Sequence, residues 1–220
     1  GYRALRFDIA GIGDSLSDKS GGFDEERLIN DVITAMNKLE QNKGIHEFVL
    51  MGLCTGAANA HKVAVVDKRV RGGIFLDGYA YPTWRFYIRR YLPGLINPAR
   101  VINRLRRSTG RLSGSAMNTS DSPEKVEDFD WWKLPPKAEL RKELTTLIDR
   151  GVNLFYVHSG SRREVYNYQH QFAEAFSSID FNGKLQVIIN AQADHTYTMT
   201  EDRIKLLDQI SDWMNKVFKS

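Results

Sequence analysis

The fold is decided by the stretch from His46 to Val66, which reads HEFVLMGLCTGAANAHKVAVV. Its first part, up to Leu53, is predicted as a buried strand, because its apolar residues follow one another with almost no polar interruption. Its second part, from Thr55, is rich in alanine and valine and predicts a helix that packs closely on a sheet. The two parts meet at a glycine-flanked turn, GLCTG, with Cys54 at its centre. The stretch therefore predicts a strand, a sharp turn and a helix in direct succession.

The same alternation of short apolar runs and helical patterns continues along the chain. Strands are predicted at Tyr2–Ile9, His46–Leu53, Val70–Leu76, Val152–Val157 and Leu185–Ile189. Helices are predicted from Phe23 to Gly44 and over Thr55–Val66, Pro136–Asp149, Val165–Phe176 and Thr200–Phe218. Continuous apolar strands that alternate with helices are typical of a mostly parallel sheet with helices on both faces. The chain is therefore assigned to the α/β class.

The alternation is interrupted once, after Leu76. About 55 residues follow that contain a helical pattern but no good strand. Residues 79–135 are therefore interpreted as a lid insertion between two parts of one core, 1–78 and 136–220, because long loops inside a compact domain tend to be functional. Within the insertion, aromatic and aliphatic residues recur at helical spacing, opposite arginines: Trp84, Tyr87, Ile88, Tyr91, Leu92, Leu95 and Ile96.

The positive charge of the chain is concentrated in this insertion. The formal net charge is +4 and the isoelectric point about 9.1. The stretch from Gly78 to Ser120 holds eight arginines and no lysine, aspartate or glutamate, so it carries +8 and leaves −4 for the rest. A mild excess confined to one insertion without a recognisable motif is unlike a dedicated nucleic-acid binder. We expect no nucleic-acid partner.

Composition argues against several other classes of protein. The single cysteine, Cys54, leaves no internal disulfide framework and no multi-cysteine zinc site. No run approaches the roughly 18 to 20 consecutive apolar residues that span a bilayer. We therefore expect a reduced, cytoplasmic protein that works without a metal or a cofactor.

Cys54 and His195 stand where a nucleophilic enzyme of this class places its nucleophile and its base. A nucleophile on a strained strand-to-helix turn needs small neighbours, because side chains on either side would clash. The N-terminus of the following helix favours the thiolate form of Cys54. His195 follows the last predicted strand and precedes the last helix, where the partner histidine belongs. Asp194, beside it, is expected to shape the histidine loop. Most of the other histidines are expected to be structural: His46, His61, His158 and His170.

These motifs resemble the α/β-hydrolase superfamily from about its fourth strand to its last helix. Residues 8–15, DIAGIGDS, are similar to the Asp-x-x-Gly-x-Gly-x-Ser loop after that fourth strand. GLCTGA at 52–57, LDGYAY at 76–81, YNY at 166–168 and ADHT at 193–196 are similar to motifs of bacterial hydrolases associated with exopolysaccharide and exosortase systems. The resemblance implies an α/β-hydrolase fold with a helical lid, whose first three strands would precede Gly1.

The resemblance leaves two candidates for the acid that orients His195. The usual site is the turn after the strand predicted at 152–157, where an acid should follow Gly160 by three residues. Arg163 occupies that position, and Glu164 comes one residue late. Asp77, at the tip of the strand after the elbow helix, is the other position from which this fold reaches its histidine. We favour Asp77 over Glu164.

The resemblance also implies an oxyanion hole and a substrate-binding lid. One oxyanion donor is the amide after the nucleophile, here Thr55, and the second comes from a loop that would precede Gly1. Without that second donor the protein would be weakly active or inactive. Trp84, Arg85 and Arg89 lie in the lid and are candidates for binding an anionic substrate or an anionic membrane surface. The alternative is a lid helix whose apolar face covers the site while its arginines are merely solvated.

The residues together predict hydrolysis of an ester or thioester. His195 would deprotonate Cys54, and the thiolate would attack the carbonyl carbon of a small acyl compound or an acylated saccharide. Acyl transfer is one alternative. Another is a non-catalytic binding module in a polysaccharide-related assembly, which the displaced acid at Glu164 favours.

Overall fold

A computed structural model describes residues 2–11, 15, 25–96 and 134–219. Residues 93–96 are described by their backbone alone. Within the described residues four strands form one sheet in the order β1-β2-β3-β4, and every neighbouring pair is parallel. The strands are β1 (Phe48–Leu53), β2 (Val70–Leu76), β3 (Asn153–Ser159) and β4 (Leu185–Asn190). Each lies within two residues of a predicted strand, so the predicted α/β class is confirmed.

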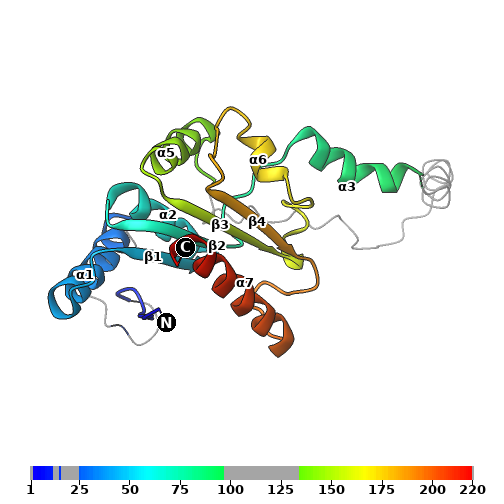
Figure 1. Cartoon of the computed structure of the whole chain (residues 1–220). Helices are drawn as coiled ribbons and strands as arrows, with labels where there is room; N and C mark the ends of the chain where they lie inside the picture. Colours follow the sequence, from blue (N-terminus) through cyan, green and yellow to red (C-terminus); the bar gives the residue numbers. More distant parts are fainter. Residues whose placement is uncertain (1, 12–14, 16–24, 97–133, 220) are drawn as a thin grey trace, which may run out of the picture.

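Helices cover both faces of this sheet (Figure 1). One face carries α1 (Glu25–Lys43), α2 (Thr55–Val66), α5 (Lys137–Asp149) and α6 (Gln171–Ala175), and the other carries α7 (Thr200–Phe218). Along β3 the side chains alternate: Leu154 and Tyr156 join the first core, while Phe155 and Val157 join the second. Burial on both faces explains why the strands are continuous apolar runs. Among the described helices, none is long and apolar enough to cross a membrane.

The strand predicted at Tyr2–Ile9 is not formed. Residues 2–9 have no regular secondary structure, and Tyr2, Leu5 and Phe7 are exposed. A strand needs a neighbour that accepts and donates its backbone hydrogen bonds. In the described part of the chain β1 pairs with β2 alone, so the first residues have joined no ladder.

The helix predicted over Val165–Phe176 is reduced to the short α6. Side chains take the hydrogen bonds that a longer helix would make through its backbone. The amide of Phe172 donates to the Tyr166 hydroxyl at 3.1 Å, and the amide of Asn167 donates to Gln171 Oε1 at 3.0 Å. This local competition between side chain and backbone delays the start of the helix to Gln171.

The first helix of the insertion, α3 (Trp84–Ile96), extends away from the sheet beyond α6 (Figure 1). One of the two interpretations of this helix was an apolar face that covers the site. The side chains of that face that the structure describes are between 45% and 63% exposed: Trp84, Tyr87, Ile88, Tyr91 and Leu92. Residues 97–133 lie outside the described residues, so the boundaries of the insertion stay a prediction.

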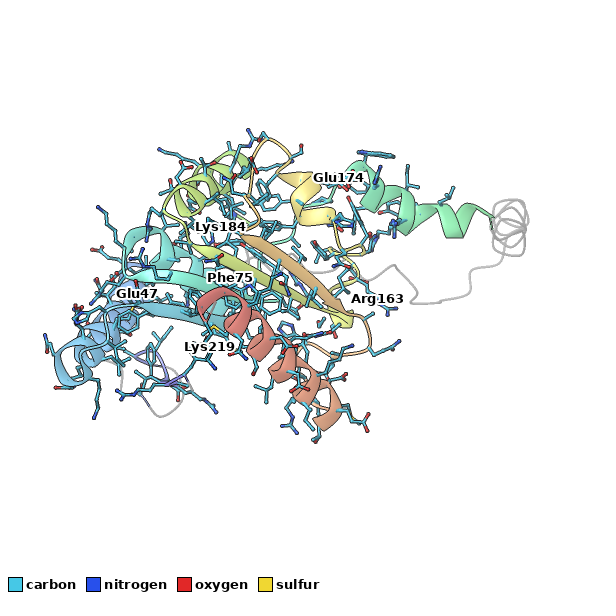
Figure 2. All side chains as sticks on the ribbon, viewed as in Figure 1. Glu47, Phe75, Arg163, Glu174, Lys184 and Lys219 are labelled. Atoms are coloured by element: carbon cyan, nitrogen blue, oxygen red, sulfur yellow. The ribbon has the colours of Figure 1, made fainter. Side chains whose placement is uncertain are left out.

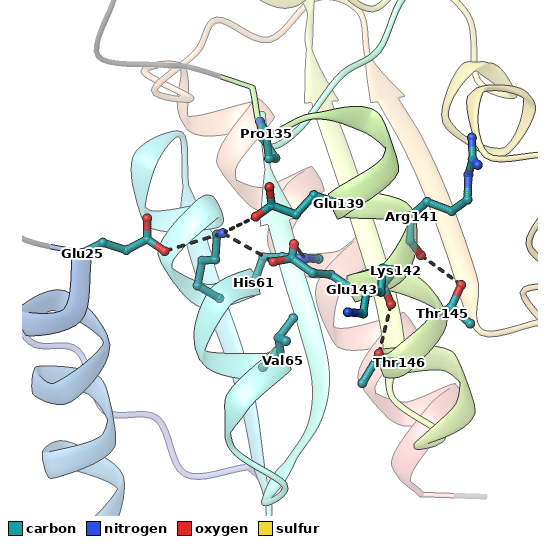
Figure 3. Close-up of polar contacts among 12 residues, drawn as sticks. Glu25, His61, Val65, Pro135, Glu139, Arg141, Lys142, Glu143, Thr145 and Thr146 are labelled. Carbon is teal, nitrogen blue, oxygen red and sulfur yellow. Dashed lines mark hydrogen bonds and ion pairs between the residues drawn. The ribbon is translucent and has the colours of Figure 1, made fainter.

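A charged cluster joins three helices on the first face of the sheet (Figure 3). Lys62 Nζ on α2 lies 3.5 Å from Glu25 on α1, and 3.6 and 3.4 Å from Glu139 and Glu143 on α5. Partial burial opposes the charge of Lys62, but the three carboxylates outweigh it and raise its pKa. Next to it, His61 Nε2 lies 3.1 Å from Glu143. The cluster connects α2 to both α1 and α5.

Candidate active site

Cys54 occupies a strained turn between β1 and α2. Its backbone has φ 57° and ψ −118°, in a region that residues other than glycine rarely adopt. A Cβ on Gly52 would lie 2.0 Å from the carbonyl oxygen of Gly56, so only glycine fits there. At Gly56 itself an added Cβ would meet no atom within 4 Å, so the expected clash on that side is wrong. The turn has the geometry of a nucleophile elbow.

The elbow lies directly beside a second strained residue, Asp77. The Cys54 amide donates to Leu76 O at 2.9 Å, and Leu53 pairs with Leu76 in the sheet. Cys54 and Asp77 are thus the next residues of neighbouring strands, whose backbones are roughly 5 Å apart. Asp77 has φ 49°, also in the left-handed region. Two sharp turns therefore bring a thiol and a carboxylate to the same edge of the sheet.

The Asp77 carboxylate is fully buried and accepts three hydrogen bonds. Its Oδ1 accepts the Ser159 amide at 2.7 Å, and its Oδ2 accepts the Ser159 hydroxyl at 2.7 Å. Oδ2 also lies 2.7 Å from Nδ1 of His195, which has come from the other end of the chain. An ionised carboxylate is an acceptor only, so Nδ1 carries a proton in this pair. The neutral ring then has its lone pair on Nε2, the form that a general base requires.

The histidine loop between β4 and α7 is fastened to the turn after β3, the 3₁₀ helix η2 (Gly160–Arg162) and Arg163. The Gly160 amide donates to Ala193 O at 2.8 Å, and the His195 amide donates to Ser161 Oγ at 3.1 Å. Arg163, labelled in Figure 2, donates to Ala191 O at 2.7 Å. A Cβ on Gly160 would lie 2.2 Å from that same carbonyl oxygen. The loop and the turn therefore form one tightly packed unit.

Asp194 binds the loop that carries the histidine, as expected. Its carboxylate accepts the amides of Thr196 at 2.8 Å and of Thr198 at 3.1 Å. Desolvation opposes its charge, but the hydrogen bonds from Thr196 and Thr198 lower the pKa of Asp194 overall. Asp194 therefore holds the local shape of the loop, while the orienting contact to His195 comes from Asp77.

Glu164, the other candidate acid, is exposed to solvent. Its backbone oxygen accepts a hydrogen bond from Arg90 of α3 at 3.0 Å, and no hydrogen bond within the described residues joins its carboxylate to His195. Of the two candidates, the structure joins Asp77 to the histidine and leaves Glu164 apart. Cys54 Sγ, partly buried, likewise makes no hydrogen bond to His195 among these residues.

The remaining predicted site residues fall into two groups. Thr55 is the first residue of α2, and no earlier helical carbonyl accepts its amide, so the amide is placed like an oxyanion donor. Two of the three candidates for substrate binding, Arg85 and Arg89 on α3, instead contact the body of the protein. Arg85 Nε lies 3.3 Å from Glu174 on α6, which Figure 2 labels beside α3, and Arg89 lies over the ring of Tyr168. Trp84 is 63% exposed, with Arg85 over its ring.

A buried histidine that the sequence assigned to the structural group lies immediately before Ser159. His158 is fully buried and stacks on Tyr166 with ring centroids 3.7 Å apart. Neither of its ring nitrogens has a hydrogen-bond partner within the described residues. Burial, assisted by the charge of Arg162, lowers the pKa of His158 to about 3. It is therefore a neutral packing residue at ordinary pH.

Ser159 and Ser161 are the site residues that sequence reasoning missed. Their roles depend on which strand end and which loop lie beside the turn, and nothing in the local pattern marks them. No group of three or more His, Cys, Asp or Glu side chains in the described ranges is arranged to hold a metal ion.

A parallel sheet with helices on both faces, a strained elbow after β1 and a histidine loop before α7 define the α/β-hydrolase fold. The chain matches a serine hydrolase from the polyaromatic-hydrocarbon-degrading bacterium Cycloclasticus zankles with a TM-score of 0.51. The two are 14% identical, and the match covers 97% of this chain and 79% of that one. At this identity the likeness establishes the fold.

Two further solved structures are similar to the chain at lower scores. A carboxylesterase structure from the ammonia-oxidizing thaumarchaeon Nitrososphaera gargenis has a TM-score of 0.45 and 12% identity, and covers 91% of this chain and 75% of that one. The acylaminoacyl peptidase of Pyrococcus horikoshii has a TM-score of 0.46 and 13% identity. That match covers 86% of this chain and 27% of the peptidase chain. No protein-family model matches the sequence, and no curated protein matches it.

Proposed function

We propose that the protein hydrolyses esters or thioesters through Cys54, His195 and Asp77. The observation that carries the proposal is the 2.7 Å contact between His195 Nδ1 and Asp77 Oδ2, at the strand end next to the cysteine elbow. A carboxylate that holds one ring nitrogen and leaves the other to accept a proton is the arrangement of a general base. The Cys54 thiol lies on a strained turn at the end of the strand that neighbours Asp77.

In the proposed reaction His195 Nε2 takes the proton of Cys54, and the sulfur attacks the carbonyl carbon of the substrate. The negative oxygen of the tetrahedral intermediate is stabilised by the amide of Thr55. The bond to the leaving group then breaks, and the alcohol or thiol leaves with the proton from His195. Water, deprotonated by His195, attacks the acyl-enzyme, the acid is released, and the proton returns to the cysteine.

A non-catalytic binding module is the second candidate, and one observation favours it. Cys54 Sγ makes no hydrogen bond to His195 in the described part of the chain. Nucleophile and base are often further apart in ligand-free enzymes and approach in the substrate complex. The experiment below therefore measures the reactivity of the thiol as well as turnover.

The test compares alkylation of Cys54 by iodoacetamide with hydrolysis of p-nitrophenyl acetate. If His195 and Cys54 act together, His195→Ala slows alkylation at pH 7, because a neighbouring imidazolium promotes thiolate formation. The same variant lowers kcat/KM by roughly 10³-fold or more. Cys54→Ala abolishes both reactions. His170→Ala, which removes an exposed histidine outside the site, leaves both unchanged.

The two candidate functions give different results in this experiment. The hydrolase predicts turnover and alkylation that both depend on His195. A binding module predicts no turnover and an alkylation rate that is the same in the wild type, His195→Ala and His170→Ala. Cys54→Ser separates a site adapted to thiolate chemistry, which loses activity, from a serine-type site, which gains it.

The resemblance to exopolysaccharide-associated hydrolases suggests an acylated saccharide as substrate and acyl transfer as a variant of the reaction. In acyl transfer a sugar hydroxyl replaces water in the second step and leaves the roles of the three side chains unchanged. Contact with a membrane surface through the lid and a cytoplasmic location also remain proposals.

A further inference from the structure

Ser159, the last residue of β3, makes two of the three hydrogen bonds to Asp77. Its amide binds Oδ1 and its hydroxyl binds Oδ2, each at 2.7 Å. Ser159 is 1% exposed and Asp77 is equally buried, so no bulk water competes for these contacts. The hydroxyl shares Oδ2 with His195 Nδ1, and an oxygen with two lone pairs is then fully used.

We propose that Ser159 is a positioning residue for the His195–Asp77 pair, an inference that rests on the proposed function. The backbone of Asp77 turns sharply at φ 49°, so its short side chain needs outside contacts to hold one orientation. The Ser159 amide alone would hold one oxygen and leave the carboxylate free to rotate about that contact. The hydroxyl holds the second oxygen where the histidine binds it.

The hydroxyl also adjusts the strength of the contact between Asp77 and His195. A donor on Oδ2 withdraws negative charge from the oxygen that faces the ring. Removing this donor concentrates negative charge on Oδ2 and strengthens its attraction for a positively charged imidazole ring. The acidic limb of the activity profile should therefore move to higher pH in a variant without the hydroxyl.

Few other titratable groups near the Asp77 carboxylate can shift the acidic limb of the pH–activity profile. His195 and Tyr197 face it from the histidine loop, with the charge of Asp77 acting on Tyr197, and Cys54 lies on the neighbouring strand end. His158 precedes Ser159 on β3, and its pKa of about 3 keeps it neutral. The Tyr197 hydroxyl accepts a hydrogen bond from Asn190 Nδ2 at 3.4 Å, and burial raises the pKa of Tyr197.

The experiment compares Ser159→Ala with Ser159→Thr, which restores a hydroxyl, and with Ser178→Ala, an exposed serine outside the site. Ser159→Ala is expected to lower kcat for p-nitrophenyl acetate roughly 10-fold, the low end for a hydrogen bond to a charged group, with KM within twofold. The acidic limb moves to higher pH. The downfield proton resonance of the His195 Nδ1–H, observed by NMR, changes position. Ser159→Thr restores both readouts in part, and Ser178→Ala changes neither.

The NMR readout separates this inference from the proposed function, because it needs no turnover. If the wild type shows no esterase activity but Ser159→Ala still shifts the resonance, the hydrolase proposal fails and the positioning role stands. A folded Ser159→Ala protein with the wild-type resonance and pH profile would overturn the positioning role. Should Ser159→Ala fail to fold, a folded Ser159→Thr protein that lacks the wild-type resonance overturns it as well.

Discussion

Asp77→Asn is expected to lower kcat/KM for an ester about 10⁴-fold while the protein stays folded. The carboxylate accepts two hydrogen bonds from Ser159 and one from His195. An amide accepts at its oxygen and donates at its nitrogen. The Ser159 amide can only donate, so the new amide oxygen must take the Oδ1 position. The NH₂ group must then take the Oδ2 position.

In that orientation the NH₂ group faces His195 Nδ1, which must become an acceptor. The neutral ring then carries its proton on Nε2 and cannot take a proton from Cys54. The Ser159 hydroxyl can turn to accept, so the buried site stays satisfied and the fold is kept. The same substitution in the serine-protease triad, where the tautomer is also wrong, costs about 10⁴ in kcat. A factor of 10⁴ corresponds to about 5.4 kcal/mol of transition-state stabilisation.

Hydrolysis of p-nitrophenyl acetate under kcat/KM conditions measures this loss, with thermal unfolding as a check on the fold. The matched comparison is Glu164→Gln, which removes the same charge from an exposed carboxylate and is expected to keep activity within twofold of the wild type. The reasoning is refuted if Asp77→Asn keeps more than a tenth of the activity, or if Glu164→Gln loses as much as Asp77→Asn.

Two further predictions concern stability. Gly52→Ala would place a Cβ 2.0 Å from a backbone oxygen, so the free energy of unfolding measured in urea should fall by at least about 3 kcal/mol. Gly56→Ala should leave this free energy unchanged or raise it by up to about 1 kcal/mol. Equal effects of the two substitutions would contradict the elbow geometry. His158 has a pKa of about 3 when folded and about 6.5 when unfolded, so the unfolded state binds the extra proton and stability should fall by about 2–3 kcal/mol between pH 6 and pH 4. His158→Phe should remove that part of the pH dependence, while His170→Phe, at an exposed position, should keep it. If the stability of His158→Phe depends on pH as steeply as that of the wild type, the buried neutral imidazole is not the source of the dependence.

The elements with a strong and uninterrupted pattern could be predicted from the sequence. The bounds of α2, β2 and α7 agree with the predicted ones, and α1 ends at Lys43, directly before the glycine that was expected to stop it. These segments are long, or strongly apolar, and their hydrogen bonds are internal to the element or to the adjacent strand. The helix predicted over Val165–Phe176 is shorter than expected because the side chains of Tyr166 and Gln171 bind backbone amides there. The periodicity of apolar residues does not reveal such side-chain contacts.

The candidate site was predictable as far as local motifs carried it. Cys54 and His195 follow from their places after a strand and before a helix. The sequence favoured Asp77 over Glu164, but the contact itself depends on the pairing of β2 with β3 and on which strand end faces the histidine loop. The role of Ser159 could not be predicted from the sequence for the same reason. The outward-facing aromatic residues of α3 could not be foreseen, since an amphipathic pattern does not say which face meets the body.

Cys54 and Asp77 belong to a single βαβ unit, since α2 connects the two strands that they follow. The spacing of the proposed nucleophile and acid is therefore set by one short, contiguous piece of chain that can form early in folding. The segment between Tyr79 and α5 can vary in length without moving one relative to the other. His195 and Ser159 must be brought to them from further along the chain. An insertion of different sequence could thus be exchanged between β2 and α5 while the proposed nucleophile and acid keep their places.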